Sequence, residues 1–138
     1  MSAARATILI VDDDADVIHT FSRMLRLEGY KVVTAHDAEA GLREMTTIWP
    51  DVVLLDLRMP LMDGLTFLRR LRARERGRCT PVAVITGDYF VEEGLLCELR
   101  ALHAVVCFKP MWLDDVLKII EDLLRRPTTD RSPRAPER

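Results

Sequence analysis

Five short apolar segments recur along the chain, and they constrain its fold more than any other feature. Most are rich in Val, Ile and Leu without alternating polar residues, which is typical of strands buried on both faces. Segments with helical periodicity lie between them. Strand and helix therefore alternate five times, which predicts an α/β fold with a doubly wound (βα)5 parallel sheet. The expected strands are Thr7–Val11, Lys31–Ala35, Asp51–Asp56, Pro81–Thr86 and Ala104–Lys109.

The intervening segments carry the marks of amphipathic helices. In the first, Val17 and Leu25 fall on the apolar face, and Ser22 falls on the polar face that we expect to meet solvent. Asp14 precedes this helix and Asp37 precedes the second. Because Asp side chains accept hydrogen bonds from the first free N–H groups of a helix, both are expected N-caps.

Length and composition narrow the class of protein. The chain has 138 residues, 49% of them hydrophobic, and a formal net charge of −2, which excludes a disordered chain and a whole-chain nucleic-acid binder. Its apolar runs are far shorter than a membrane-spanning helix. No membrane partner is therefore expected. Three unpatterned cysteines, Cys79, Cys97 and Cys107, indicate reduced thiols and a cytoplasmic location. We expect one domain over residues 1–125 and a flexible tail or linker over 126–138.

Residues 68–78 contain six arginines and one glutamate. Positive charge at the end of a helix complements its dipole, so we expect a solvated, stabilising surface. A basic docking patch for an acidic partner or nucleic acid is the alternative. No aromatic residues interleave with the arginines, so direct nucleic-acid binding is not expected.

Polar residues gather where the expected strands end. Asp12 and Asp13 follow the first strand, Asp56 ends the third, Thr86 ends the fourth and Lys109 ends the fifth. Because the carboxyl ends of parallel strands share one edge of a sheet, these side chains can converge there.

Three carboxylates about 4 to 5 Å apart repel by about 3 to 4 kcal/mol per pair at an effective dielectric near 20. One lysine offsets only part of that charge, whereas a hard divalent cation such as Mg²⁺ suits carboxylate oxygens. A carboxylate, a metal, a lysine and a hydroxyl are the parts of a phosphoryl-transfer site.

Four motifs in this order carry a resemblance to a known family: residues 8–14 (ILIVDDD), 53–64 (VLLDLRMPLMDG), 84–87 (VITG) and 108–110 (FKP). Together they resemble the response-regulator receiver domain of two-component signalling, over roughly residues 6–125. The resemblance implies a flavodoxin-like sheet with strand order 2-1-3-4-5. It also implies a signalling switch and not an enzyme that turns over a metabolite.

The resemblance implies a Mg²⁺ site. Asp13 and Asp56 would bind the ion directly and Asp12 through water. The main-chain carbonyl of Arg58 would complete the ligands supplied by the protein.

The resemblance also implies a phosphoryl site. Asp56 would accept the phosphoryl group from a phosphohistidine of a histidine kinase or phosphotransfer protein. Lys109 would pair with one phosphoryl oxygen, and the Thr86 hydroxyl and the Gly87 amide would bind others. The modified domain would then change its surface for a downstream protein partner, as a monomer or weak homodimer.

Two positions depart from the family pattern. Val106 stands where receivers usually carry Tyr or Phe, and Leu102-His103 stands where they usually carry Gly-Ala. Val106 favours an alternative, a phosphorylation-independent receiver-like module for interaction or dimerisation. A phosphatase with an Asp nucleophile is a third reading, but it would normally need a second Asp at position 58, which is Arg58.

Overall fold

The computed structural model describes residues 5–87, 91–109 and 111–125. The tail expected over residues 126–138 lies outside the described residues, so its flexibility stays a prediction. Among the described helices, none is both long and apolar enough to cross a membrane.

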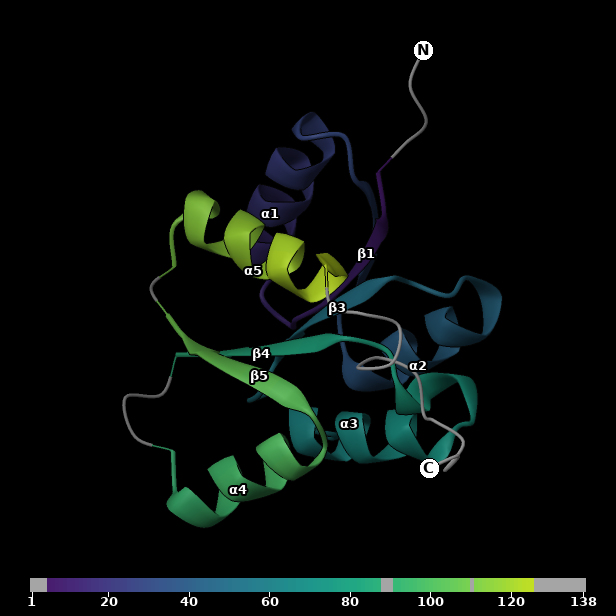
Figure 1. The fold of residues 1–138 in the computed structure, drawn as a ribbon, viewed down its shortest axis with the longest axis vertical. Coiled ribbons are helices and arrows are strands. Elements are labelled where there is room, and N and C mark those ends of the chain that lie inside the picture. The colour runs from purple at the N-terminus through teal and green to yellow at the C-terminus, as the bar shows by residue number, and fades with distance from the viewer. Residues whose placement is uncertain (1–4, 88–90, 110, 126–138) are drawn as a thin grey trace.

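Five parallel strands form one sheet in the order β2-β1-β3-β4-β5 (Figure 1). Both the α/β class and the expected strand order are confirmed, and each observed strand lies within one residue of its predicted limits. The strands are β1 (Thr7–Val11), β2 (Lys31–Ala35), β3 (Val52–Asp56), β4 (Val82–Thr86) and β5 (Ala104–Phe108). The helices are α1 (Ala15–Leu27), α2 (Ala38–Thr47), α3 (Gly64–Ala73), the 3-10 turn η1 (Arg76–Arg78), α4 (Glu93–Ala101) and α5 (Leu113–Arg125).

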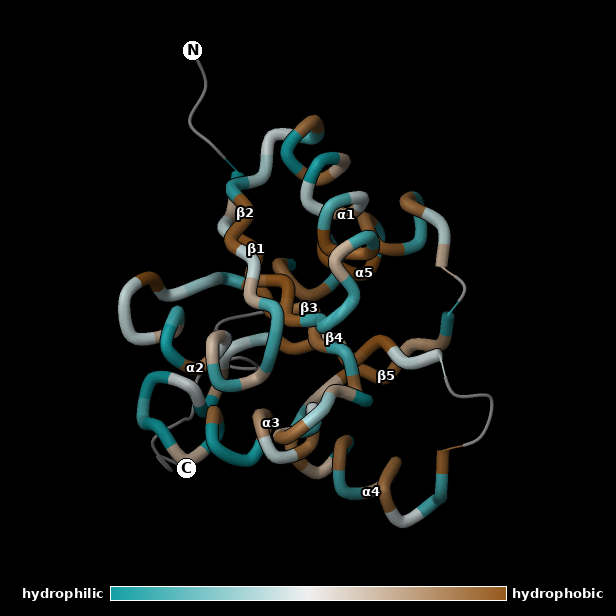
Figure 2. The backbone as a smooth tube through the Cα atoms, turned by 180° about the vertical axis from the view of Figure 1, so that it is seen from behind, coloured by the Kyte–Doolittle hydropathy of each residue, from teal (hydrophilic) through white to brown (hydrophobic). Residues whose placement is uncertain are grey.

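Alternate residues of each strand pack into two separate hydrophobic cores, one on each face of the sheet. In β1, Leu9 and Val11 pack toward α2 and α3, whereas Ile8 and Ile10 pack toward α1 and α5. Figures 1 and 2 show these two helical layers from opposite sides. Because both faces are covered, the strands read as continuous apolar runs. Burial of each aliphatic side chain stabilises the fold by about 1.5 to 3 kcal/mol.

The expected helix caps are confirmed. The Asp14 carboxylate accepts a hydrogen bond from the N–H of Asp16 at 2.9 Å, and the Asp37 carboxylate accepts one from Ala40 at 2.7 Å. The chain leaves α1 through Gly29, whose φ of +95° favours glycine.

The expectation that Ser22 faces solvent is wrong. Ser22 is 6% exposed and lies on the buried face of α1 with Ile18 and Leu25. The spacing of these three residues by four and three positions places them on one face. The Ser22 hydroxyl donates to the carbonyl of His19 at 3.5 Å, which lets a small polar residue occupy this face.

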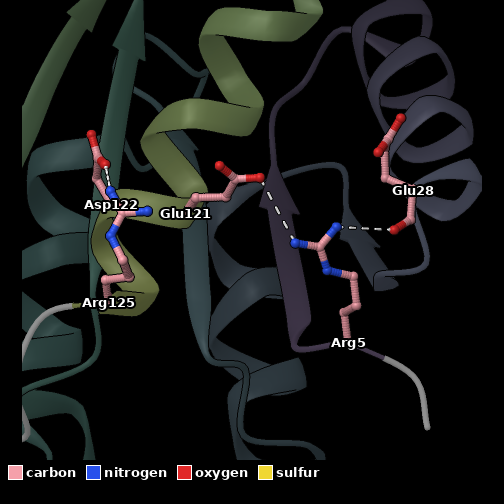
Figure 3. Close-up of polar contacts among 5 residues, drawn as sticks. All are labelled: Arg5, Glu28, Glu121, Asp122 and Arg125. Carbon is pink, nitrogen blue, oxygen red and sulfur yellow. Dashed lines mark hydrogen bonds and ion pairs between the residues drawn. The ribbon is translucent and has the colours of Figure 1, made fainter. Parts of the chain in front are cut away.

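Arg5 links the start of the sheet to both helices of one layer (Figure 3). Its guanidinium lies 3.8 Å from the Glu121 carboxylate of α5, donates to the Glu28 carbonyl at 3.2 Å and stacks 4.4 Å from the Tyr30 ring. These contacts lie at the N-terminal edge of the sheet, opposite the edge where the strands end. They therefore fasten α5 to the turn after α1 without occupying the candidate site.

The expectation of a solvated arginine surface is wrong for Arg72. Its guanidinium donates to main-chain carbonyls of four residues, and burial lowers its pKa to about 10. The side chain therefore joins the end of α3 to the start of β4 and to the turn between α4 and β5. The acceptors are Gly77 (2.7 Å), Thr80 (2.8 Å), Leu102 (2.8 Å) and His103 (3.5 Å).

Two further arginines of the run also make specific contacts. Arg74 donates to the Leu42 carbonyl at 3.1 Å, and Arg76 lies 4.5 Å from the centre of the Trp49 ring. The first contact joins the middle of α2 to the C-terminal end of α3, and the second joins the segment after α2 to η1. Arg72, Arg74 and Arg76 therefore make specific contacts within the domain, and the alternative of a basic docking patch stays a prediction.

We expect Arg72→Lys to lower the free energy of unfolding by about 2 to 3 kcal/mol, because an ammonium group cannot satisfy these carbonyls in a planar fork. Arg70→Lys, on the exposed face of the same helix, is the matched control and should change stability by less than about 0.5 kcal/mol. Urea unfolding of both variants measures the difference. Equal stability of the two variants would contradict the structural role of Arg72.

Candidate functional site

Three carboxylates meet at the C-terminal edge of the sheet. Asp12 and Asp13 follow β1, and Asp56 is the last residue of the neighbouring strand β3, whose Leu55 lies beside Val11 in the register. One carboxylate oxygen from each of the three aspartates lies within 4.8 Å of the others. The convergence expected from the strand ends is therefore present.

Lys109 and Thr86 lie beside this cluster. The Lys109 ammonium is 3.8 Å from the Asp12 carboxylate, and the Lys109 N–H donates to the Thr86 carbonyl at 2.8 Å. The Thr86 residue is fully buried. A Cβ atom added at Gly87 would lie 3.7 Å from the Lys109 side chain, so the Gly87 backbone borders the lysine. Pro110, the last residue of the FKP motif, lies outside the described residues.

Burial shapes the electrostatics of the two central acids. Asp12 and Asp56 are 5% and 8% exposed. Loss of solvation, followed by the nearby charge of Asp12, raises the pKa of the Asp56 carboxyl to about 6, while Lys109 opposes the rise. Loss of solvation also raises the pKa of the Asp12 carboxyl. Two carboxylates are thus held where their charged forms are disfavoured, which calls for a compensating cation.

Local hydrogen bonds explain how the acids are held. An Asp12 carboxylate oxygen accepts from the Asp14 N–H at 2.9 Å, and the Asp12 N–H donates to the Ala35 carbonyl at 3.1 Å. The Arg58 N–H binds the Asp56 carboxylate and partly opposes the rise in its pKa. Backbone groups therefore orient both carboxylates while leaving oxygens available for a ligand.

Gly64, the last residue of the 53–64 motif, has a positioning role that the sequence did not suggest. A Cβ atom at this position would lie 2.5 Å from the Asp56 carbonyl oxygen. The Gly64 N–H donates to the Leu57 carbonyl at 2.9 Å. The first turn of α3 thus packs directly on the backbone of Asp56, which requires a residue without a side chain. The only sequence signal was a glycine directly after Asp63, the N-cap of α3.

The donor set fits a hard divalent cation. It consists of carboxylate oxygens from Asp12, Asp13 and Asp56, with Asp13 exposed at the rim. Small hard cations such as Mg²⁺ take oxygen ligands and need only a few from the protein. The contribution of the Arg58 carbonyl stays a prediction.

We expect the raised pKa of Asp56 to make the metal-free protein less stable as pH rises from about 4 to about 6. In that range the unfolded chain has released the proton that the folded chain still holds, so unfolding becomes easier. Asp56→Asn removes this ionisation and should raise stability at pH 7.5 by about 2 kcal/mol, with little difference near pH 4.

Urea unfolding in the presence of EDTA at both pH values measures this effect. Glu44→Gln, an acid-to-amide change on α2, is the control and should show no such pH-dependent gain. An Asp56→Asn variant that is less stable than the parent at pH 7.5 would contradict the electrostatic argument.

Comparisons with known proteins agree with the fold and the site. A family model described as the response regulator receiver domain matches residues 8–121. The chain is 36% identical over 119 residues to the transcriptional regulatory protein PrrA of Mycobacterium bovis, covering 86% of this chain and 50% of that protein. It is 36% identical over 129 residues to the response regulator MprA of a Mycobacterium species, covering 94% of this chain and 55% of that protein.

Solved structures share the architecture. The chemotaxis protein CheY4 of Vibrio cholerae superposes with a TM-score of 0.81 at 29% sequence identity, covering 88% of this chain and all of that chain. The present chain spans about half the length of the first curated relatives it matches. With a family model matched over most of the chain and two independent likenesses in sequence and in fold, this chain belongs to the response regulator receiver domain family.

Proposed function

We propose that this receiver domain accepts a phosphoryl group on Asp56 in two-component signalling. A carboxylate oxygen of Asp56 would attack the phosphorus of a phosphohistidine on a histidine kinase or phosphotransfer protein. The new O–P bond forms as the N–P bond breaks, and the departing imidazole takes up a proton. The observation that carries the proposal is the meeting of three carboxylates with Lys109 beside buried Thr86.

The same acids would hold Mg²⁺ during this transfer. Asp13 and Asp56 would bind it directly, Asp12 through water, and the Arg58 carbonyl would supply a further ligand. When bound, the ion neutralises charge and orients the phosphoryl oxygens. Support comes from the oxygen-only donor set and from the burial of Asp12 and Asp56, which raises the pKa of both carboxyls and disfavours their charged forms without a cation.

Lys109 and Thr86 would convert the new charge into a change of shape. A phosphoryl group adds up to about two negative charges, so Lys109, now 3.8 Å from Asp12, gains a stronger partner. The Thr86 hydroxyl and the Gly87 amide would donate to other phosphoryl oxygens. Because Lys109 and Thr86 are joined through their backbones, their movement would shift the ends of β4 and β5 and the adjoining partner surface.

The location and the partners of this domain are also part of the proposal. We infer a cytoplasmic signalling role, with a kinase or phosphotransfer protein as donor and a protein as the downstream partner. We expect the domain to bind neither a membrane nor nucleic acid directly. The domain would act by binding, as a monomer or weak homodimer, and would not turn over a metabolite.

One observation favours a second candidate, a receiver-like module that works without phosphorylation. Val106 occupies a half-buried position on β5, packed against the core that faces α3 and α4. The short, branched side chain of valine cannot swing between two positions as a large aromatic ring can, and receivers usually carry such a ring at this position. The two functions differ in whether a phosphoryl mimic changes the binding surface.

We expect Asp56→Asn to reduce Mg²⁺-dependent labelling by a small acyl phosphate to background, because the nucleophilic oxygen is lost. Asp16→Asn, the same change at an exposed site in the first turn of α1, should label like the parent protein. Intact-mass spectrometry of the two variants measures the stoichiometry. Full labelling of Asp56→Asn would show that another residue is the acceptor.

We expect Lys109→Ala to retain Mg²⁺ binding, because the metal ligands are the acids. The conformational response to a beryllofluoride mimic should weaken at least tenfold, which corresponds to a lost charge-assisted hydrogen bond of about 1.5 to 3 kcal/mol. Calorimetry measures metal binding, and hydrogen exchange of β4 and β5 measures the response. An unchanged exchange response would remove Lys109 from the switch, and no response in the parent protein would favour the second candidate.

A further inference from the structure

Helix α3 divides its arginines between its two neighbouring helices. On one side, Arg69 binds the Glu98 carboxylate of α4, and Arg72 binds carbonyls of the turn that follows α4. On the other side, α3 packs beside α2 on the same face of the sheet (Figures 1 and 2), and Arg74 donates to a carbonyl of α2. Arg70 precedes Arg74 by four positions, so it also lies on the side of α3 that faces α2.

Four arginines at the end of α3 and on η1 form a surface that we call the α3–η1 patch. Its members are Arg70, Arg74, Arg76 and Arg78. Three of them are exposed, and Arg74 is half-buried. Within the described part of the chain, none of the four forms an ion pair with a carboxylate. Their charge is therefore uncompensated, unlike that of Arg69, which Glu98 neutralises.

Two of these guanidinium groups are held in place by partners that carry no charge. Arg74 donates to the Leu42 carbonyl at 3.1 Å, and Arg76 lies 4.5 Å from the centre of the Trp49 ring. A carbonyl and a ring restrict the side chain without cancelling its charge, and they leave further N–H groups free to donate. The patch is organised in advance for an anion, because less side-chain entropy is lost when a ligand binds.

The patch lacks the features that would suit a membrane. Its members carry no exposed apolar side chain that could insert into a bilayer. The large hydrophobic residues that are exposed in the described ranges lie elsewhere and are Leu27, Leu61, Phe108 and Trp112.

A nucleic acid also fits poorly. Trp49 is half-buried with Arg76 over its ring, so that face of the ring is not available for stacking on a base. Exposed Glu75 separates two of the arginines along the chain and would repel a continuous row of phosphates. A short run of carboxylates, which can be placed around this glutamate, is the better match.

We propose that the α3–η1 patch docks an acidic segment of a partner protein, whose Asp or Glu side chains bind the arginines. Guanidinium groups suit this role because their planar donors match both oxygens of a carboxylate. Charge complementarity identifies the occupant, and it is local, because the whole chain has a net charge of −2. Helix α3 runs away from the acid cluster toward η1, so this docking is separate from phosphoryl transfer and does not depend on it.

Binding of a model peptide to the full chain tests the patch. The probe is a fluorescein-labelled peptide of Glu-Gly repeats, and a Gln-Gly peptide of the same length is its uncharged counterpart. Fluorescence anisotropy at low ionic strength should detect binding of the first peptide and not of the second. Arg70→Gln and Arg78→Gln should each weaken binding about threefold, and the double variant about tenfold. Arg23→Gln, the same change on the exposed surface of α1, should bind like the parent.

Arg76→Lys tests the arrangement of the donors apart from their charge. Lysine keeps the positive charge but lacks the planar group that stacks on Trp49 and matches a carboxylate. We expect this variant to bind the Glu-Gly peptide about threefold more weakly than the parent. Arg23→Lys is the matched control and should leave the affinity unchanged, and urea unfolding shows that both variants are folded.

Four outcomes would overturn the proposal. The first two are a parent protein that does not bind the Glu-Gly peptide, and an equal loss of affinity in Arg23→Gln and the patch variants. The others are an Arg76→Lys variant that binds like the parent, and tighter binding of an oligothymidine or of phosphatidylserine vesicles than of the peptide. Acyl phosphate labelling of Asp56 should remain normal in the patch variants, so a failure of docking is distinguishable from a failure of the proposed function.

Discussion

Repulsion among closely placed carboxylates is the constraint on which the site depends. Asp12, Asp13 and Asp56 are brought within 4.8 Å of one another by strands that are otherwise apolar. The fold tolerates this charge because hydrophobic burial on both faces of the sheet far outweighs the local electrostatic cost. Under the proposed function, this unfavourable charge would give the site its affinity for a cation and its sensitivity to added phosphoryl charge.

The backbone around the acids is as important as their charge. The pairing of β1 with β3 sets the lateral distance between Asp12 and Asp56. The close approach of Gly64 to the Asp56 carbonyl sets the height of α3 above the site. Because these are contacts between main-chain atoms of regular elements, they hold the side chains without a dedicated scaffold of polar residues.

Strand β5 unites two features of the molecule. Its last residue, Phe108, directly precedes Lys109, and within the described part of the chain β5 is one of the two edge strands of the sheet. At the start of β5, Arg72 of α3 holds the turn between α4 and β5 by donating to the carbonyls of Leu102 and His103. The strand is therefore anchored at its start and carries the site lysine just beyond its end.

The positions of the strands and of two helix N-caps could be predicted from the sequence alone. Unbroken apolar runs located the five strands, and Asp14 and Asp37 were recognisable caps because capping depends only on neighbouring N–H groups. The strand order came from the family resemblance, since the alternation of strand and helix restricts the topology without defining it. The candidate acids were also visible, because parallel strands must end at a common edge.

Only the tertiary structure decided features that depend on residues distant in sequence. Periodicity placed Ser22 toward solvent, but the packing of α1 on the sheet buries it with Ile18 and Leu25. The arginine run gave no sign that Arg72 would bind carbonyls about thirty positions away, at Leu102 and His103. Charge and periodicity are local properties of a chain, whereas the partners that satisfy a buried side chain are assembled by the fold.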